Sequence, residues 1–362
     1  MRLKSAEKLL KRATNGAIAA LMGRSTQGER PDWRAKPYRV LFLRHDRIGD
    51  MILSTGILRA IAQSHPTIRL DVLASKTNAP VLANEPYLSE IIAFDRKATA
   101  KYASVFKDLR RRRYDAVIDC MVTAPSTTTL LLMLASGARS RIGVAGRGND
   151  FAYTLPVPAR EHAEHIVDKL GALVAAFGLQ PTAVDLRPRV RLTTDELKQG
   201  ERAWRGGTDR SPTSGPRVLV NVSAGRAHHY WPDDRFGLVI QSVVAAFRNA
   251  EVVVVSSPSD RLRAESIAAR GGARLGAEQG IPHAMSIVAC ADVVFTPDTS
   301  IAHAASALEK PQVVLHPRGF ARLWGPYQSE GRALESASDE VRGISADDAA
   351  RALVTMIRAV VS

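Results

Sequence analysis

Several large classes of protein are excluded by what the sequence lacks. Its 362 residues include two cysteines, Cys120 and Cys290, which form neither a CxxC pair nor a His/Cys cluster of the kind that binds zinc. No apolar run approaches the roughly 20 residues that span a bilayer. The basic N-terminus contains Glu7 and has too short an apolar core for a secretory signal. These absences predict a cytoplasmic protein with buried free thiols.

Common nucleotide-binding and catalytic motifs are also missing. The sequence has no GxxxxGK[ST] phosphate loop, no GxGxxG fingerprint and no GxSxG nucleophile elbow. It also has no Asp-x-Asp pair, which metal-dependent sugar transferases use to hold a nucleotide diphosphate through a cation. We therefore expect no metal and no resident cofactor. An anionic ligand would have to be bound by basic side chains and helix N-termini.

Acidic residues are few relative to basic ones, since 50 Lys and Arg face 36 Asp and Glu and the net charge is +14. This balance favours an anionic partner. No recognised nucleic-acid module accompanies it, so we expect a phosphorylated substrate or a membrane surface rather than nucleic acid. Residues 1–37 form a basic N-terminal extension, interpreted either as a helix lying on an anionic membrane or as a solvated tail. The predicted helix 106–115 adds a second basic patch.

Short β-branched runs alternate with helical patterns after Lys36, which predicts βαβ units and mostly parallel sheets. Strands are predicted at 39–44, 68–74, 90–95, 115–120, 217–222, 251–256, 292–297 and 312–316. Helices are predicted at 50–63, 76–84, 100–113, 126–135, 162–179, 193–205, 233–247, 259–270, 282–290 and 299–308. The fold class is therefore α/β, with two doubly wound domains at 38–206 and 217–345 and a C-terminal helix at 346–362. The linker composition of 206–216 marks the expected boundary, and a cleft is expected at the carboxyl ends of the strands.

Three polar segments follow predicted strands at points where helices begin. RHDRIGD (44–50) ends in Asp50, an acid at the start of a helix, where a capping role is the simplest interpretation. In NVSAGRAHHYWPDDRF (221–236), basic side chains either face a phosphate or form ordinary solvated surface. In VVFTPDTSIAHAASALEKP (293–311), the helix opening at Asp298 either offers free amides to an anion or is simply capped, with His303 a satisfied polar residue.

Together these segments resemble the family 9 glycosyltransferases, the heptosyltransferases of lipopolysaccharide core assembly. The family's R-x-x-x-x-G-D turn resembles RHDRIGD, its K-x-W-P element resembles HHYWP, and its D-T-G-x-x-H-x-A-A-A-L motif resembles DTSIAHAASAL. The resemblance covers about residues 38–345. It implies the GT-B fold, in which two Rossmann-like domains face each other across a cleft.

The resemblance also implies an activity, which is inverting transfer of a heptose from an ADP-activated nucleotide sugar to a glycolipid acceptor. Asp50 is then the general base, and a carboxylate at a helix N-terminus stays charged and able to accept a proton. Donor or phosphate binding falls to Ser223, Arg226, His229, Asp298, Thr299, Ser300 and His303. Asp260 matches the ribose-binding acid, and the acceptor-side residues are Arg44, Arg47 and Gly49. Such an enzyme would be cytoplasmic and peripheral on the inner face of the cytoplasmic membrane.

Two departures from the family pattern keep other functions open. His229 stands where the family has Lys, and Ser300 stands where it has Gly. A neutral imidazole stabilises a diphosphate less than an ammonium does. The alternatives are therefore an epimerase-like protein that acts on a nucleotide sugar and a non-catalytic protein that only binds one.

Overall fold

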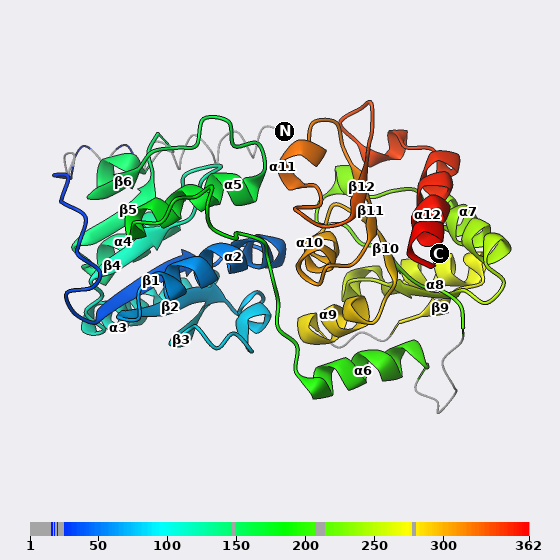
Figure 1. The fold of residues 1–362 in the computed structure, drawn as a ribbon, viewed down its shortest axis with the longest axis horizontal. Coiled ribbons are helices and arrows are strands. Elements are labelled where there is room, and N and C mark those ends of the chain that lie inside the picture. The colour runs from blue at the N-terminus through cyan, green and yellow to red at the C-terminus, as the bar shows by residue number, and fades with distance from the viewer. Residues whose placement is uncertain are drawn as a thin grey trace. The chain divides into compact units, whose positions relative to one another are not determined.

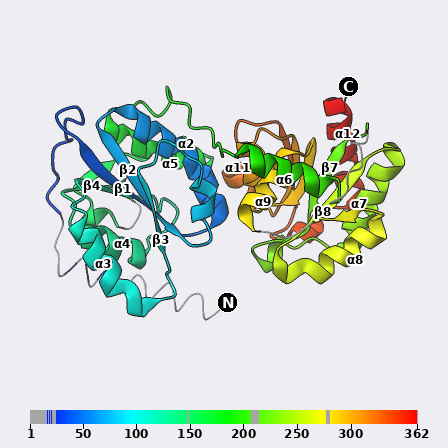
Figure 2. The ribbon, with the colours of Figure 1, turned by 90° about the horizontal axis from the view of Figure 1, so that it is seen from below.

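The computed structural model describes residues 25–146, 149–206, 214–276 and 280–361, together with residues 16, 18 and 20. The chain divides into two compact units, Met1–Leu186 and Arg187–Ser362, and each is described by itself (Figures 1 and 2). Nearly all of the predicted N-terminal amphipathic helix lies outside the described residues. Among those that are described, no helix is both long enough and apolar enough to cross a membrane.

The first unit is built on a six-stranded parallel sheet in the order β3-β2-β1-β4-β5-β6. Its strands are β1 (Tyr38–Arg44), β2 (Ile68–Ser75), β3 (Glu90–Phe94), β4 (Ala116–Asp119), β5 (Ser140–Val144) and β6 (Leu155–Val157). Its helices are α2 (Ile48–Ser64), α3 (Tyr102–Arg111), α4 (Thr127–Ser136) and α5 (Ile166–Gly171), with 3-10 turns η1 (Ala79–Leu82), η2 (Thr99–Lys101), η3 (Asp150–Ala152) and η4 (Ala172–Phe177). Figure 2 shows the sheet between the α2–α5 pair and the α3–α4 pair, which is why the central strands are apolar on both faces.

The second unit repeats this plan with a six-stranded sheet in the order β12-β11-β10-β7-β8-β9. Its strands are β7 (Arg217–Asn221), β8 (Glu251–Val255), β9 (Arg274–Leu275), β10 (Val293–Pro297), β11 (Gln312–His316) and β12 (Gly331–Glu335). Its helices are α6 (Thr194–Trp204), α7 (Asp233–Ala246), α8 (Arg261–Gly271), α9 (Ile281–Ala289), α10 (Ser300–Ala307), α11 (Ala321–Trp324) and α12 (Ala346–Val361), with 3-10 turns η5 (Ala227–His229), η6 (Pro258–Asp260) and η7 (Val341–Gly343). Edge-to-face rings of Trp231, Phe236 and Phe295 fill its core.

Counted along the chain within each unit, both sheets have the order 3-2-1-4-5-6 of a doubly wound Rossmann fold. The predicted fold class is confirmed. The order reverses between β1 and β4 in the first unit and between β7 and β10 in the second. Ligands of open parallel sheets bind beyond the carboxyl ends of the strands at such reversals. The loops that follow these four strands are therefore where a site is expected.

The boundary between the units differs from the predicted linker at 206–216. The division falls after Leu186, and helix α6 packs on α9 of the second unit. Trp204 at the end of α6 is fully buried there, and its indole N–H donates to the carbonyl of Ile287 at 2.9 Å. Burial of this one large side chain decides where the helix belongs. The linker composition marks only a loop, most of which lies outside the described residues.

Two terminal segments predicted to stand apart belong to the units. Residues 25–36, assigned to the extension 1–37, pack on the first unit, because the ring of Trp33 stacks on Phe177 at 4.7 Å between centroids. Only 3% of Trp33 is exposed. The predicted C-terminal helix 346–362 is confirmed as α12, but its Leu353 and Ile357 lie in the core of the second unit. Buried apolar contacts, not charge or position in the chain, make both segments part of the fold.

Candidate functional site

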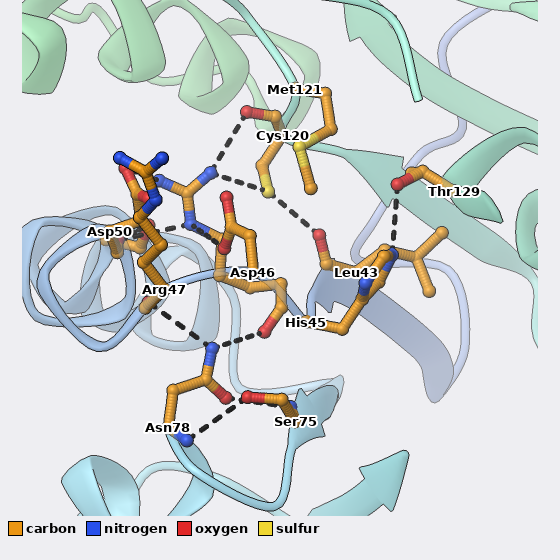
Figure 3. Close-up of polar contacts among 12 residues, drawn as sticks. Leu43, His45, Asp46, Arg47, Asp50, Ser75, Asn78, Cys120, Met121 and Thr129 are labelled. Atoms are coloured by element: carbon orange, nitrogen blue, oxygen red, sulfur yellow. Dashed lines mark hydrogen bonds and ion pairs between the residues drawn. The ribbon is translucent and has the colours of Figure 1, made fainter. Parts of the chain in front are cut away.

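A buried arginine joins the two strand ends at the reversal in the first sheet (Figure 3). Only 3% of Arg44, the last residue of β1, is exposed. Its Nη1 donates to the carbonyl oxygen of Cys120 at 3.3 Å and to the Cys120 sulfur at 3.1 Å, just beyond β4. The Cys120 thiol in turn donates to the carbonyl of Leu43 at 2.8 Å. The guanidinium therefore ties β1 to β4 where a ligand is expected.

The same guanidinium meets two carboxylates from the loop that follows β1. Its Nη2 lies 3.5 Å from Oδ1 of Asp50, and its Nε lies 3.5 Å from Oδ1 of Asp46. Nε also donates to the main-chain carbonyl of Asp50 at 3.1 Å. Burial by itself would lower the pKa of Arg44, but attraction to Asp46, Cys120 and Asp50 outweighs it and raises the pKa. Arg44 is thus a permanent, buried cation in contact with both Asp46 and Asp50.

Helix α2 presents Asp50 in its first turn. The helix begins at Ile48, and its N-cap residue Arg47 makes no side-chain capping bond. Free amides in a first turn favour a carboxylate, and 15% of the Asp50 side chain is exposed. Fully buried Asn78 fixes the loop between β1 and α2, because its amide donates to the carbonyls of Arg44 at 3.1 Å and Arg47 at 3.4 Å (Figure 3). The acid is fixed in place yet open to solvent.

His45 anchors the other side of this loop as a neutral group. Its Nε2 lies 3.1 Å from the hydroxyl of Thr129 at the start of α4, and its ring meets Phe94 edge-on with centroids 5.4 Å apart. Burial lowers the pKa of His45 to about 4. The imidazole is therefore uncharged at neutral pH, so it contributes position and polarity to the loop rather than charge.

In the second unit, Asn221 joins the strand ends at the equivalent reversal. Its side-chain amide donates to the hydroxyls of Thr296 at 2.9 Å and Thr299 at 3.1 Å. Its side-chain oxygen accepts the main-chain N–H of Ser223 at 3.3 Å. Thr299 is the N-cap of α10 and accepts the N–H of Ile301 at 3.2 Å. The start of α10 and the loop after β7 are consequently locked together.

Three imidazoles surround the carboxylate of Asp298, just before α10. Nδ1 of His229 and Nδ1 of His316 lie 3.6 Å and 3.9 Å from its Oδ2, and Nε2 of His303 lies 3.9 Å from its Oδ1. All four side chains are largely or fully buried. No group of three or more His, Cys, Asp or Glu in the described part of the chain is arranged to hold a metal ion. The three imidazoles and the carboxylate therefore converge just before the N-terminus of α10.

Asp260 lies one strand further along the second sheet, at the end of η6. Its carboxylate accepts the Tyr230 hydroxyl at 3.0 and 3.2 Å and the Ser257 hydroxyl at 3.0 Å. Ser257 donates its main-chain N–H to the hydroxyl of Ser223 at 2.7 Å. Burial and the bond to Asp260 raise the pKa of Tyr230. Hydrogen bonds through Ser257 and Ser223 therefore link Asp260 to the loop that follows β7.

Arg263 of α8 fixes both ends of the loop that follows β7. Its guanidinium donates to the main-chain carbonyls of Val222 and, at 2.5 Å, of Trp231. Nε donates to the carboxylate of Asp233 at 2.5 Å. One side chain therefore closes a loop whose middle is left to carry the predicted donor residues.

The structure places most of the predicted donor residues together, namely Ser223, His229, Asp298, Thr299 and His303. Ser300 follows them as the first residue of α10, while Arg226 is exposed in the middle of its loop. In the first unit, Arg47 is exposed and Gly49 is buried. The sequence reasoning missed four positioning residues: Asn78, Asn221, Arg263 and His316. For Asn221 a signal existed, since it is the polar residue that ends an apolar strand.

Comparison with known proteins shows which family the chain resembles. Residues 102–347 match the family model of glycosyltransferase family 9 (heptosyltransferase). The chain is 24% identical over 299 residues to lipopolysaccharide heptosyltransferase 3 of Escherichia coli, covering 78% of this chain and 84% of that protein. It is 22% identical over 314 residues to lipopolysaccharide heptosyltransferase 2 of Escherichia coli, covering 82% and 87%.

Solved structures show the same fold. A family 9 glycosyl transferase from Veillonella parvula has a TM-score of 0.78 at 16% identity and covers 90% of this chain and 98% of its own. ADP-heptose lps heptosyltransferase II of Escherichia coli has a TM-score of 0.70 at 19% identity, with coverage of 89% and 99%. These likenesses confirm the expected GT-B fold of two Rossmann-like domains.

Proposed function

The chain belongs to glycosyltransferase family 9 and is a glycosyltransferase, and we propose that it transfers a heptose from ADP-heptose, with inversion, to a lipopolysaccharide core or related glycolipid. The observation that carries the proposal is Asp50, held over a buried cation at the carboxyl end of the first sheet. Curated relatives named as lipopolysaccharide heptosyltransferases support the choice of sugar and acceptor.

Asp50 is the proposed general base. Its carboxylate takes the proton of an acceptor hydroxyl while that oxygen forms a bond to the anomeric carbon of the donor. The bond from this carbon to the diphosphate breaks on the opposite face, and the nucleotide leaves with the electron pair. Arg44 keeps the carboxylate charged and in place before the proton moves, because it bonds both its side chain and its main chain.

The second unit supplies the proposed donor site. A leaving diphosphate gains most from donors already oriented toward it, such as the first amides of a helix. The N-terminus of α10 is such a group, and Asn221 fixes it beside Ser223. We assign His229 and His303 to the phosphate side and Asp260 to the ribose. Arg226, exposed nearby, adds the positive charge that His229 lacks when neutral.

The proposed acceptor defines where the enzyme works. A glycolipid core is assembled on a lipid held in a membrane, whereas a nucleotide sugar is soluble. We therefore propose a cytoplasmic enzyme that meets its acceptor at the inner face of the cytoplasmic membrane.

The deciding experiment is a donor and acceptor screen read by mass spectrometry. Purified protein is incubated with ADP-heptose or with other ADP-, GDP- and UDP-sugars, each with and without purified core glycolipids. The proposal expects one heptosyl residue added to a glycolipid together with release of ADP. Turnover of a free nucleotide sugar without an acceptor would instead identify an epimerase. Donor binding without any turnover would identify a non-catalytic binding protein.

A further inference from the structure

The protein's positive charge is concentrated in two short segments. Residues 1–37 contain nine Lys and Arg and three acids, and residues 96–113 contain eight Lys and Arg and one acid. Together they account for thirteen of the fourteen net positive charges. The rest of the chain is close to neutral, so the charge belongs to particular surfaces rather than to the protein as a whole.

The second segment forms an exposed basic surface on the first unit. We call it the α3 basic face, and its members are Arg96, Lys97, Lys101, Lys107, Arg111 and Arg113. No acidic side chain among the described residues forms an ion pair with any of them. The one acid within the segment, Asp108, pairs instead with Arg112 at 2.9 Å, and Arg112 also pairs with Glu90. The charge of the face is therefore not cancelled locally.

One described residue of the N-terminal segment packs in the same core cluster as α3. Leu109 of α3 is buried in a core cluster, and Tyr102, Val105 and Phe106 of the same helix pack against it. Ile18, from the N-terminal segment, packs against that cluster too. Ile18 and helix α3 thus share one core cluster of the first unit, although more than eighty residues separate them along the chain.

The α3 basic face begins at the same end of the sheet as the loop that follows β1 and contains Asp50. Strands β1, β2 and β3 are parallel neighbours, so the loops that follow β1 and β3 leave the same edge. Phe94, the last residue of β3, meets His45 of the site loop at 5.4 Å between rings. Arg96 lies two residues further on and is near enough for its charge to act on His45. From there the face continues along α3.

We propose that the α3 basic face docks the protein on an anionic membrane surface and presents the Asp50 loop to an acceptor held there. Long cationic side chains on one helix and on the turns at its two ends suit a plane of lipid phosphates, and their attraction acts within a Debye length of about 8 Å. A single-stranded nucleic acid would need exposed aromatic rings for stacking, but Tyr102 and Phe106 face the core. The nature of the acceptor rests on the proposed function, whereas the docking itself does not.

The test compares two full-length variants that each lose three charges. Lys97→Gln/Lys107→Gln/Arg111→Gln removes charge from the α3 basic face. Arg248→Gln/Arg270→Gln/Arg332→Gln is the matched control, since these residues are exposed on the second unit. Binding is measured by sedimentation with vesicles of phosphatidylcholine containing phosphatidylglycerol, and with pure phosphatidylcholine. Each basic residue near the surface contributes a factor of about five, so the first variant should bind about 100-fold more weakly. The control should bind like the wild type.

Other outcomes would overturn the proposal. They are equal loss in both variants, wild-type binding that ignores phosphatidylglycerol, or release by RNA at physiological salt more readily than by free anionic lipid. A separate assay keeps the proposed function distinguishable. ADP binding by calorimetry and transfer to a short water-soluble acceptor should be unchanged in the α3 variant. A wild type that binds vesicles but neither binds ADP nor transfers sugar would leave the docking in place and refute the function.

Discussion

The guanidinium of Arg44 lies 3.5 Å from the carboxylate of Asp50 and also donates a hydrogen bond to that residue's main-chain carbonyl. A carboxylate accepts a proton only in its ionised form and must be correctly placed, and contact with a cation favours both. Arg44 is itself held by the carbonyl and sulfur of Cys120 across the sheet reversal. The position of the acid therefore depends on two strands as well as on the start of α2.

Asp50→Asn should abolish transfer while leaving the fold and donor binding intact. The amide keeps the shape of the side chain but cannot take the acceptor proton, and loss of a general base typically costs ~10²–10⁴ in rate. Turnover is measured with saturating donor, and ADP binding by calorimetry. Asp46→Asn is the matched control, because it also removes a carboxylate 3.5 Å from Arg44. Similar losses in both variants would mean that Arg44's charge balance, not proton transfer, limits the rate.

His45 should make the fold less stable in mild acid. Its pKa is about 4 in the folded chain, below the ordinary value of about 6.5. As pH falls from 6.5 to 4, His45 is protonated in the unfolded chain but not in the folded chain. The contribution of His45 to the free energy of unfolding is therefore fully present above pH 6.5 and decreases as pH falls toward 4. The loss is about 3 kcal/mol.

His45→Gln tests this, because glutamine can still bond Thr129 but does not titrate. Urea unfolding at pH 7 and pH 4.5 should show a smaller drop for the variant than for the wild type. Identical drops in the two proteins would show that His45 does not contribute to the acid sensitivity.

Much of the fold followed from the sequence, because buried strands of a parallel sheet are continuous apolar runs. β1, β2 and β11 were predicted within one residue of their observed bounds. Four strands were missed: β5, β6, β9 and β12. β6, β9 and β12 are short edge strands, rich in proline or polar residues, whose pairing with a neighbour creates them. β5 lies inside the sheet, but its five residues include serine, arginine and glycine and give no continuous apolar run. The predicted helix 162–179 is α5 followed by η4, and 76–84 keeps only η1. Local periodicity does not determine such tertiary effects.

Asn221→Ala should lower both the stability of the second unit and its affinity for the donor. Removing the amide leaves the buried hydroxyl of Thr296 and the N-cap Thr299 without their shared donor, at a cost of about 1–3 kcal/mol. ADP affinity should fall because the start of α10 is no longer fixed. Thermal unfolding and calorimetry measure the two effects. Asn249→Ala, which truncates an exposed amide, should change neither.

His229→Lys should tighten ADP binding several-fold at pH 8. A lysine would add a permanent charge beside the N-terminus of α10, which a neutral imidazole does not supply. The gain is kept modest because Asp298, 3.6 Å from His229, would neutralise part of it. His229→Gln serves as the uncharged control. Unchanged affinity in calorimetry would assign the phosphate contact to Arg226 or His228 instead.

Site residues could be predicted where the sequence around them forms a recognisable motif. They could not be predicted where their role depends on contacts with residues far away in the sequence. Asp50 and Thr299 stand at strand–helix junctions, and the order of motifs along the chain exposes them. Arg263 fixes a loop some forty residues earlier in the chain, and only the folded unit reveals this. His316 closes an apolar strand and gives no hint of Asp298. Such pairings depend on sheet order, which periodicity does not encode.

The last prediction separates the two parts of the N-terminal segment. Deleting residues 1–23 should weaken binding to anionic vesicles but spare transfer to a short soluble acceptor, because it removes five basic residues and keeps Trp33. Deleting residues 1–36 should also cost about 3–5 kcal/mol of stability, because Trp33 is lost. Its indole N–H donates to the carbonyl of Ala176 at 2.8 Å, and its ring packs between Tyr38 and Phe177.

Thermal unfolding followed by circular dichroism measures the difference between the two deletions, with full-length Trp33→Ala as the control that keeps every charge. That variant should melt like the longer deletion and still bind vesicles like the wild type below its melting temperature. Vesicle binding unchanged by the shorter deletion would leave membrane attachment to the α3 basic face alone. Equal melting temperatures for both deletions would instead show that residues 24–36 contribute little to the first unit, in conflict with the burial of Trp33.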